Sequence, residues 1–229
     1  MRKTIALLAS ILFTTLCWSA TEKEKAISRL HDAADVLQSL VSAPDKGIPR
    51  DVLEKAKCIA VVPRQLKVGF VVGAEHGRGV ATCRTSQGWS APAFFTITGG
   101  SWGAQIGLEG IDNVLVFMNQ KGMDKLLANK FRIGADASAA AGPVGRHASA
   151  GTDWKMESEI LSYSRAKGIF AGATLDGAVV KPDDDAMTAF YGQDVTFQQV
   201  LRGRVPSPPV AKEFLEAVEN SVAKTNAKS

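Results

Sequence analysis

Apolar side chains recur along the chain in two rhythms, one typical of helices and the other of strands. The first segment with helical spacing carries the apolar residues Ile27, Leu30, Ala34, Leu37 and Val41. Thr21 and Glu24 have the spacing of a capping box, and Pro44 follows the last turn. The pattern predicts an amphipathic helix. Its polar face mixes both charges, so we expect it to pack against the domain rather than lie on anionic lipid.

The middle of the chain is rich in glycine and β-branched residues, and its apolar positions form short runs. The runs that we predict as strands are Cys58–Val62, Lys67–Glu75, Gly79–Thr85, Trp89–Thr98, Ile111–Asn119 and Leu175–Val180. Pro63 is expected to end the first of them. The connections at His76–Arg78 and Ser86–Gly88 are short, and close turns between adjacent strands imply antiparallel hairpins.

Helical spacing returns between and after these runs. The further helices that we predict are Asp51–Lys57, Gly122–Ala128, Ala186–Tyr191 and a last helix with Phe214, Leu215, Val218 and Val222 on one face. The predicted fold class is therefore α+β. We expect an antiparallel glycine-rich sheet packed with N- and C-terminal helices, and a barrel-like curl of the sheet is a variant that the pattern leaves open.

The first twenty residues differ from the rest. Arg2 and Lys3 are followed by an almost uncharged apolar run, Thr4–Leu16, and then by small residues up to Ala20. This order predicts an export signal over residues 1–20 and a single domain over residues 21–229. The expected location is the periplasm or cell envelope. A lipoprotein acylated at Cys17 is the second choice, because Leu16 is bulky for that signal, and a retained anchor is a further alternative, although the run is short for a membrane span.

Composition and charge narrow the function. The chain has 229 residues, of which 45% are hydrophobic and 22% charged, as expected for a globular domain. The net charge of +4 includes Arg2 and Lys3, so removal of the signal leaves +2. Without a clustered basic stripe we expect no nucleic-acid partner. We predict no metal site, because the three histidines lie in unlike settings, and no cofactor, because no phosphate loop or dinucleotide fingerprint occurs.

Two cysteines remain once the predicted signal is removed. Cys58 and Cys83 lie in runs that we interpret as strands of one hairpin, in a chain expected to reach an oxidising compartment. A disulfide between them is predicted, and two buried thiols are the alternative.

Cations, hydroxyls and glycines occur together twice between residues 141 and 173. Arg146 and His147 follow a Gly-Pro-Val-Gly turn, and Arg165 and Lys167 follow Ser162–Ser164. Glycine lets backbone N–H groups approach an anion, and arginine supplies a planar fork of donors. These turns could hold an anionic group, or they could be ordinary β-turns whose cations face water.

The segment Gly99–Gly103 supplies the sharpest enzymatic hypothesis. It matches the G-x-S-x-G pattern with Ser101 as nucleophile, and Asp136 and His147 follow in the order of an α/β-hydrolase triad. A nucleophile elbow needs a helix directly after the serine, and residues 105–110 contain two glycines, which disfavour one. A glycine bulge or tight crossing beside Trp102 is the structural alternative.

Several segments, read in order, resemble the SYLF domain family. They are IPRDVLEKAKCIAVVP (48–63), KVGFVVGAEHGRGVATCR (67–84), GWSAPAFFTITGGSWGAQIG (88–107), GADASAAAGPVGRHASAGTD (134–153) and ILSYSRAKGIFAGATLDGA (160–178). The resemblance implies a non-catalytic domain that binds acidic phospholipids. In eukaryotic members these lipids are phosphoinositides, and some of those members also bind actin filaments.

For this chain the resemblance predicts peripheral binding to acidic head groups, and actin binding only by family analogy. The predicted head-group contacts are Arg146, Arg165 and Lys167, with Arg78 and Arg84 as weaker candidates. Because the chain is expected to be exported, phosphatidylglycerol or cardiolipin is the more available anion. The alternatives are the serine hydrolase above and an envelope adaptor that binds another protein.

Overall fold

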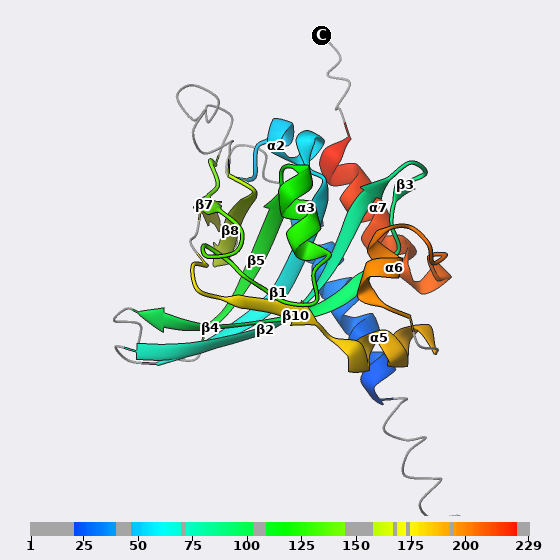
Figure 1. Cartoon of the computed structure of the whole chain (residues 1–229), viewed down its shortest axis with the longest axis horizontal. Coiled ribbons are helices and arrows are strands. Elements are labelled where there is room, and N and C mark those ends of the chain that lie inside the picture. The colour runs from blue at the N-terminus through cyan, green and yellow to red at the C-terminus, as the bar shows by residue number, and fades with distance from the viewer. Residues whose placement is uncertain are drawn as a thin grey trace, which may run out of the picture.

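The computed structural model consists of one curled sheet and helices on both of its sides (Figure 1). It describes residues 21–39, 47–69, 72–102, 109–144, 158–166, 169–172, 175–192 and 195–223. The helices are the N-terminal helix (residues 21–39), α2 (Arg50–Lys55), α3 (Gln120–Leu126), α5 (Asp184–Tyr191), α6 (Phe197–Leu201), a 3₁₀ turn η1 (Pro209–Ala211) and α7 (Lys212–Val222).

The strands form a ten-stranded sheet within the described residues. They are β1 (Cys58–Gly69), β2 (Val72–Thr85), β3 (Gly88–Trp89), β4 (Ala93–Trp102), β5 (Glu109–Phe117), β6 (Phe131–Arg132), β7 (Ala139–Ala141), β8 (Ile160–Ala166), β9 (Ile169–Gly172) and β10 (Val179–Pro182). The order is β6-β10-β4-β2-β1-β5-β8-β7, with β3 on β2 and β9 on β8. Every pairing is antiparallel except β7 with β8. The sheet curls into a half-barrel, which confirms the predicted α+β class and its curled variant.

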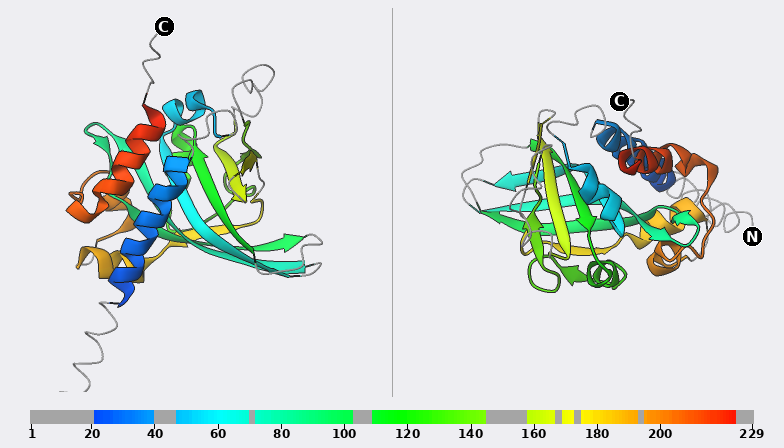
Figure 2. Two further views of the ribbon diagram at one scale, coloured as in Figure 1. Left: turned by 180° about the vertical axis from the view of Figure 1, so that it is seen from behind. Right: turned by 90° about the horizontal axis from the view of Figure 1, so that it is seen from above.

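The two sides of the sheet are covered by different helices. α3 lies on the concave side, in front of the sheet in Figure 1, whereas the N-terminal helix and α7 lie side by side on the convex side (Figure 2). The N-terminal helix buries Ala26, Leu30, Ala33, Val36 and Leu37, each at most 2% exposed. The predicted amphipathic helix is therefore confirmed, with its apolar stripe turned toward the sheet.

Alternation along the strands supplies both layers of the core. Val61 of β1 and Val80 of β2 are register partners that face the N-terminal helix. The side chains of Phe94 and Phe95 on β4 and of Phe117 on β5 are fully buried. On the concave side Phe117 packs edge-to-face on Phe131, with ring centroids 6.3 Å apart. Because successive strand residues point to opposite faces, these continuous apolar runs fill both layers at once.

Among the strand boundaries that differ from the prediction, two concern a glycine and a proline. Residues 76–78 form no turn, because they pair with Ile97 and its neighbours in the middle of β2. A Cβ on Gly77 would lie 2.5 Å from Val62 Cγ1, so the glycine there serves close packing and not a turn. Pro63 also does not end its strand. β1 continues to Gly69 after a bulge, since its register with β5 shifts between Val62 and Gln65.

The bulge turns two side chains in opposite directions. Arg64 adopts a positive φ of 49° and its side chain is 68% exposed. Gln65 returns to the interior, where it is fully buried and its Oε1 accepts a hydrogen bond of 2.7 Å from Asn113 Nδ2. The irregularity therefore places an arginine on the surface directly after the buried run Cys58–Val62.

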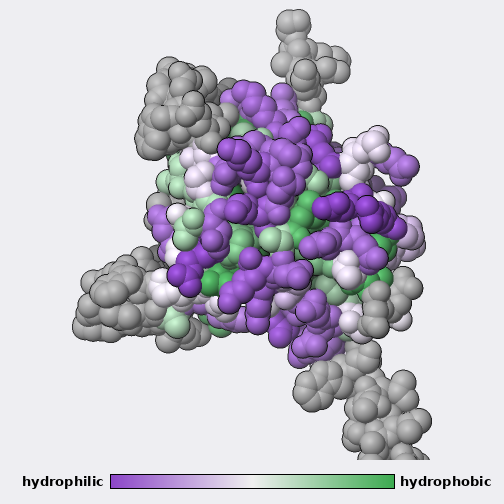
Figure 3. Space-filling view, in the orientation of Figure 1, coloured by the Kyte–Doolittle hydropathy of each residue, from purple (hydrophilic) through white to green (hydrophobic). Residues whose placement is uncertain are grey.

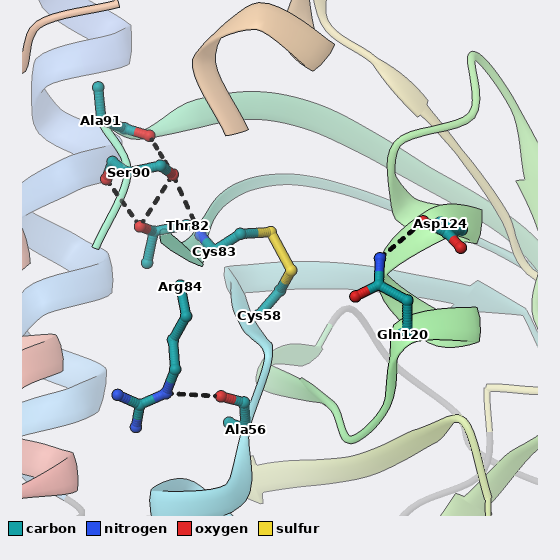
Figure 4. Close-up of a disulfide and its surroundings, with 9 residues drawn as sticks. All are labelled: Ala56, Cys58, Thr82, Cys83, Arg84, Ser90, Ala91, Gln120 and Asp124. Carbon is teal, nitrogen blue, oxygen red and sulfur yellow. Dashed lines mark hydrogen bonds between the residues drawn. A yellow bond between two sulfur atoms is a disulfide. The ribbon is translucent and has the colours of Figure 1, made fainter. Parts of the chain in front are cut away.

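A disulfide joins the two strands at the centre of the sheet. Cys58 and Cys83 are register partners on β1 and β2, both are fully buried, and their sulfurs are bonded (Figure 4). Beside them, Ser90 Oγ accepts a hydrogen bond from the backbone N–H of Cys83 at 3.1 Å. The pairing is the one expected from the hairpin.

Removing this disulfide should lower stability without changing the fold. Changing Cys58 and Cys83 together to alanine releases a loop with a sequence separation of 25 residues, which corresponds to about 3 kcal/mol in the unfolded state. Urea unfolding with and without reductant measures the difference. If the double variant unfolds at the same urea concentration as the oxidised parent, the disulfide is not part of the native protein.

The two tyrosines of the chain report on the integrity of the core. Tyr163 is fully buried, and Tyr191 is partly buried and donates to Pro92 O at 2.6 Å. Burial raises the pKa of both phenols above the ordinary value near 10. Because their folded-state pKa is the higher one, their contribution to stability is complete below about pH 10 and is lost as pH rises through the folded-state pKa.

We therefore expect no phenolate absorbance at about pH 11, followed by a cooperative rise when the protein unfolds in stronger alkali. Spectrophotometric titration with far-ultraviolet circular dichroism as the control makes the comparison. Ionisation of either tyrosine near its ordinary pKa, with circular dichroism unchanged, would show that the ring is not buried.

Candidate functional site

The structure describes three of the five cations predicted to bind head groups, Arg78, Arg84 and Arg165. Arg146 and Lys167 lie outside the described residues, as does His147. Arg78 lies in the middle of β2, Arg84 near the C-terminal end of the same strand, and Arg165 on β8. Arg165 was expected in a turn, and the structure instead pairs it with Asp112 of β5 in regular antiparallel register.

Arg84 stabilises the end of a helix. Its Nε donates to Ala56 O at 2.8 Å, as Figure 4 shows, and Nη2 donates to Glu54 O at 3.1 Å. Its guanidinium also lies 4.6 Å from the centroid of the Trp89 ring. These contacts satisfy carbonyls at the C-terminal end of α2 and add a cation–π interaction. The position of Arg84 is therefore explained by its structural contacts, and the prediction that it binds a head group is not needed to account for it.

Arg165 and Arg78 both reach the N-terminal helix. Arg165 Nε donates to Asp112 Oδ2 at 2.8 Å, and Nη1 donates to Ser39 Oγ at 2.5 Å. Arg78 Nη1 donates to Glu22 Oε2 at 3.4 Å, and its side chain is 45% exposed. The Lys25 ammonium, with Arg78 adding to its effect, lowers the pKa of Glu22.

Arg64 is a third arginine that contacts the N-terminal helix, and it was not among the head-group contacts predicted from the sequence. Its guanidinium donates to Asp32 of the N-terminal helix, and its backbone N–H donates to Asp112 Oδ1 at 2.9 Å. Asp112 thus links Arg64 to Arg165 through its two oxygens. The available signal was Pro63, because proline inside a strand often marks a bulge that turns its neighbours outward.

Arg64, Arg78 and Arg165 therefore form what we term the arginine row. Their partners Glu22, Asp32 and Ser39 fall within about 100° of one another around the helix. The opposite flank faces α7, where His31 Nδ1 lies 2.6 Å from Glu213 Oε2. Three arginines from β1, β2 and β8 thus line one flank of the N-terminal helix on the convex side of the sheet.

A buried ion pair holds the helix beside the row. Arg29 Nη1 donates to Asp183 Oδ2 at 3.1 Å and to Gly79 O at 3.4 Å, and its guanidinium lies 5.3 Å from the centroid of the Phe94 ring. The two side chains are 6% and 7% exposed. Burial lowers the pKa of Arg29, and the charge of Asp183 opposes that effect. Asp183 also caps α5 by accepting from Ala186 N.

The hydrolase hypothesis does not find its local structure among the described residues. Ser101 pairs with Gly73 inside β4, which continues to Trp102, so the strand does not end at the serine as an elbow requires. The carboxylate of Asp136 accepts from the backbone N–H of Arg132 at 2.7 Å. No group of three His, Cys, Asp or Glu side chains that could hold a metal ion occurs in the described part of the chain.

One pocket in the described chain does not suit an anionic ligand. A pocket between α5 and α6 is lined by Asn129, Pro182, Asp184, Thr188, Val195, Thr196, Phe197 and Gln198. It contains a carboxylate and no cation. The face around α3 in Figure 3 is mostly hydrophilic, with only small apolar patches between polar residues. The arginine row is taken as the candidate site because it brings two of the predicted cations together with a third arginine.

The buried ion pair between Arg29 and Asp183 predicts that one substitution strongly lowers the free energy of unfolding. Changing Asp183 to asparagine leaves Arg29 buried without its counter-charge, which should cost about 3 kcal/mol of folding free energy. Asp184→Asn is the matched control, because Asp184 occupies the same first turn of α5 and is exposed. Chemical denaturation compares the variants. Equal losses for the two would mean that the helix dipole, and not the buried pair, accounts for the effect.

Comparisons with known proteins identify the family. Residues 98–221 match the family model Ysc84, described as "Las17-binding protein actin regulator". Over 202 residues the chain is 33% identical to "Protein YSC84" of Saccharomyces cerevisiae, covering 84% of this chain and 43% of the yeast protein. Over 206 residues it is 30% identical to "SH3 domain-containing YSC84-like protein 1" of Rattus norvegicus, covering 89% of this chain and 60% of the rat protein.

The match to the family model extends from β4 to α7, and both relatives are considerably longer than the region they share with this chain. A second yeast relative, "LAS seventeen-binding protein 3", is 31% identical over 202 residues. The chain belongs to the Ysc84 family, whose shared region is the SYLF domain.

Proposed function

We propose that this protein binds peripherally to membranes rich in acidic phospholipid, without catalysing a reaction, and that the arginine row meets the head groups. The observation that carries the proposal is the convergence of Arg64, Arg78 and Arg165 on one flank of the N-terminal helix. Arginine pairs bidentately with phosphate, so a surface of this composition suits a phospholipid head group.

The ion pairs within the row are compatible with this role. Arg64 and Arg78 have side chains that are 68% and 45% exposed, whereas the side chain of Arg165 is 21% exposed. Ion pairs of exposed arginines contribute only about 0–1 kcal/mol. A guanidinium carries five N–H donors, so one bonded to a carboxylate still has donors for a phosphate oxygen. The carboxylates moderate binding and do not occupy the arginines completely.

An apolar side chain accompanies the cations. Leu66 follows Arg64 on β1 after Gln65 and is 44% exposed. Its register partner is His76, which is exposed on β2. A leucine beside arginines can enter the boundary between head groups and acyl chains while the cations stay at the phosphates. None of the described helices has the length and apolar character to cross a membrane, and the proposed contact is superficial.

The proposed location follows from the predicted export signal. We propose that residues 1–20 direct the chain out of the cytoplasm and that it acts in the periplasm or cell envelope. Phosphatidylglycerol and cardiolipin are then the anions within reach, in place of phosphoinositides.

Removal of two arginines should weaken binding to anionic vesicles. Each arginine near an anionic surface contributes about 1 kcal/mol, so Arg64→Ala with Arg78→Ala should reduce partition roughly 30-fold. Sedimentation with phosphatidylglycerol vesicles measures the loss, and neutral phosphatidylcholine vesicles give the baseline. The variant Arg202→Ala with Arg204→Ala is the control, because it removes the same charge from exposed positions between α6 and η1.

The control variant separates binding through the arginine row from adsorption that depends only on the total charge of the protein. Equal losses for the two double variants would mean that total charge governs adsorption and that the row is not the binding surface. Equal partition of the parent protein onto neutral and anionic vesicles would remove the lipid proposal altogether.

Binding of another protein is the second candidate. The description of the family names a protein partner, and one yeast relative is named for the same partner. An envelope adaptor is the corresponding function for an exported chain, and actin is a partner only by family analogy. Crosslinking in cells separates this candidate from the first: crosslinks from positions beside the row should reach lipid if the first is right and a single protein if the second is right.

A further inference from the structure

The three arginines of the row are held apart by the helix that they flank. Their partners Glu22, Asp32 and Ser39 are ten and seven residues apart in sequence. At 1.5 Å per residue these separations correspond to about 15 Å and about 10 Å along the helix axis. A hydrogen bond to phosphate spans only about 3 Å, so one phosphate cannot bond to all three guanidinium groups where they are anchored.

Each arginine also has its own carboxylate neighbour. Glu22 accepts from Arg78, Asp32 accepts from Arg64, and Asp112 accepts from Arg165. Each site is thus a cation whose charge is largely balanced in the absence of lipid. A single head group would gain little there, because it competes with a carboxylate that is already in place.

Resting on the proposed function, we propose that the arginine row measures the density of negative charge on a membrane, with one lipid for each arginine. The paired carboxylates, Glu22 and Asp32 of the N-terminal helix and Asp112 of β5, set the threshold at which binding begins. The ligand class is then a surface of many monoanionic phospholipids, and not one polyphosphorylated head group held in a pocket.

Several weak lipid sites along one rigid helix make binding depend steeply on the density of anionic lipid. When the first arginine has met a lipid, the helix holds the other two close to the bilayer, so their binding becomes intramolecular. Affinity then depends on the product of three weak steps. Bound protein should rise more steeply than in proportion to the fraction of anionic lipid, and a soluble head group, which cannot engage three sites together, should not compete.

Vesicle titration tests the number of lipids. Binding is measured on phosphatidylcholine vesicles with increasing phosphatidylglycerol, in the presence and absence of glycerol 1-phosphate at millimolar concentration. We expect a sigmoidal dependence, approaching the third power of the anionic fraction at low fractions, and no displacement by glycerol 1-phosphate. A hyperbolic dependence with displacement would overturn the inference and leave the proposed function intact, whereas no binding at any fraction would overturn the proposed function itself.

A matched pair of substitutions tests the role of the helix carboxylates. Asp32→Asn removes the partner of Arg64, and Asp35→Asn removes the same charge from an exposed position of the helix that contacts no arginine of the row among the described residues. We expect Asp32→Asn to shift half-maximal binding to a severalfold lower anionic fraction, and Asp35→Asn to shift it less. Equal shifts, or weaker binding of Asp32→Asn with its fold intact by circular dichroism, would refute a threshold set by the carboxylate.

Discussion

Arg29 is a buried charged residue between the N-terminal helix and the sheet. The position of the helix depends on the ion pair that neutralises this charge. Asp183, at the start of α5, forms the ion pair with Arg29. Gly79 O accepts a second hydrogen bond from Arg29, and the Phe94 ring lies against the guanidinium. An arginine that is only 6% exposed tolerates little displacement, since movement would leave its charge unpaired in the interior. The pair therefore fixes the register of the helix on the convex face, from which the positions of Glu22, Asp32 and Ser39 follow.

The candidate site depends on that register. β1, β2 and β8 each contribute one arginine, and the helix supplies the groups that they meet. The arrangement separates two tasks. The buried pair gives the helix a single position. Arg64 and Arg78, whose side chains are 68% and 45% exposed, remain available for exchange with a ligand, whereas Arg165 is only 21% exposed and is held more firmly by Asp112. An anionic surface can then compete for the arginines without disturbing the core beneath them.

Periodicity predicted the parts of the fold in which local pattern and packing agree. The stripe of the N-terminal helix and most of the apolar strands follow from spacing. The pairing of Cys58 with Cys83 needed the expected hairpin and the expected oxidising compartment as well. Periodicity failed at Gly77, where a glycine typical of turns is needed because Val62 packs across the strand. Distant contacts of this kind leave no local signal. β6, β7 and α6 were not predicted because they are short and take their place from neighbours far away in sequence. β8 and β9 were not predicted either, because the cations and glycines in this stretch were interpreted as turns, whereas the pairing of β8 with β5 and of β9 with β8 makes them strands.

The site was less predictable than the fold for the same reason. Residue type indicated Arg78, Arg84 and Arg165, but it could not show that Arg84 closes the end of α2 while the other two flank a helix. For Arg64 the one local signal was Pro63, which indicates a bulge but not the partner of the arginine. Its place depends on a bulge after Pro63 and on a carboxylate 32 residues earlier in the chain. A charge that meets its partner only through tertiary structure cannot be assigned from local sequence.

The central claim, that the face carrying the arginine row is the face that meets the membrane, can be tested by placing spin labels on the bound protein. Leu66, beside Arg64, and Val210, on η1, have similar exposed fractions of 44% and 38%. Each is replaced by a nitroxide-labelled cysteine, and collision with a water-soluble relaxation agent is measured with and without phosphatidylglycerol vesicles. The account predicts that the label at position 66 becomes shielded on binding and the label at position 210 does not. Shielding at 210 alone, or at neither position while the protein sediments with the vesicles, would contradict it.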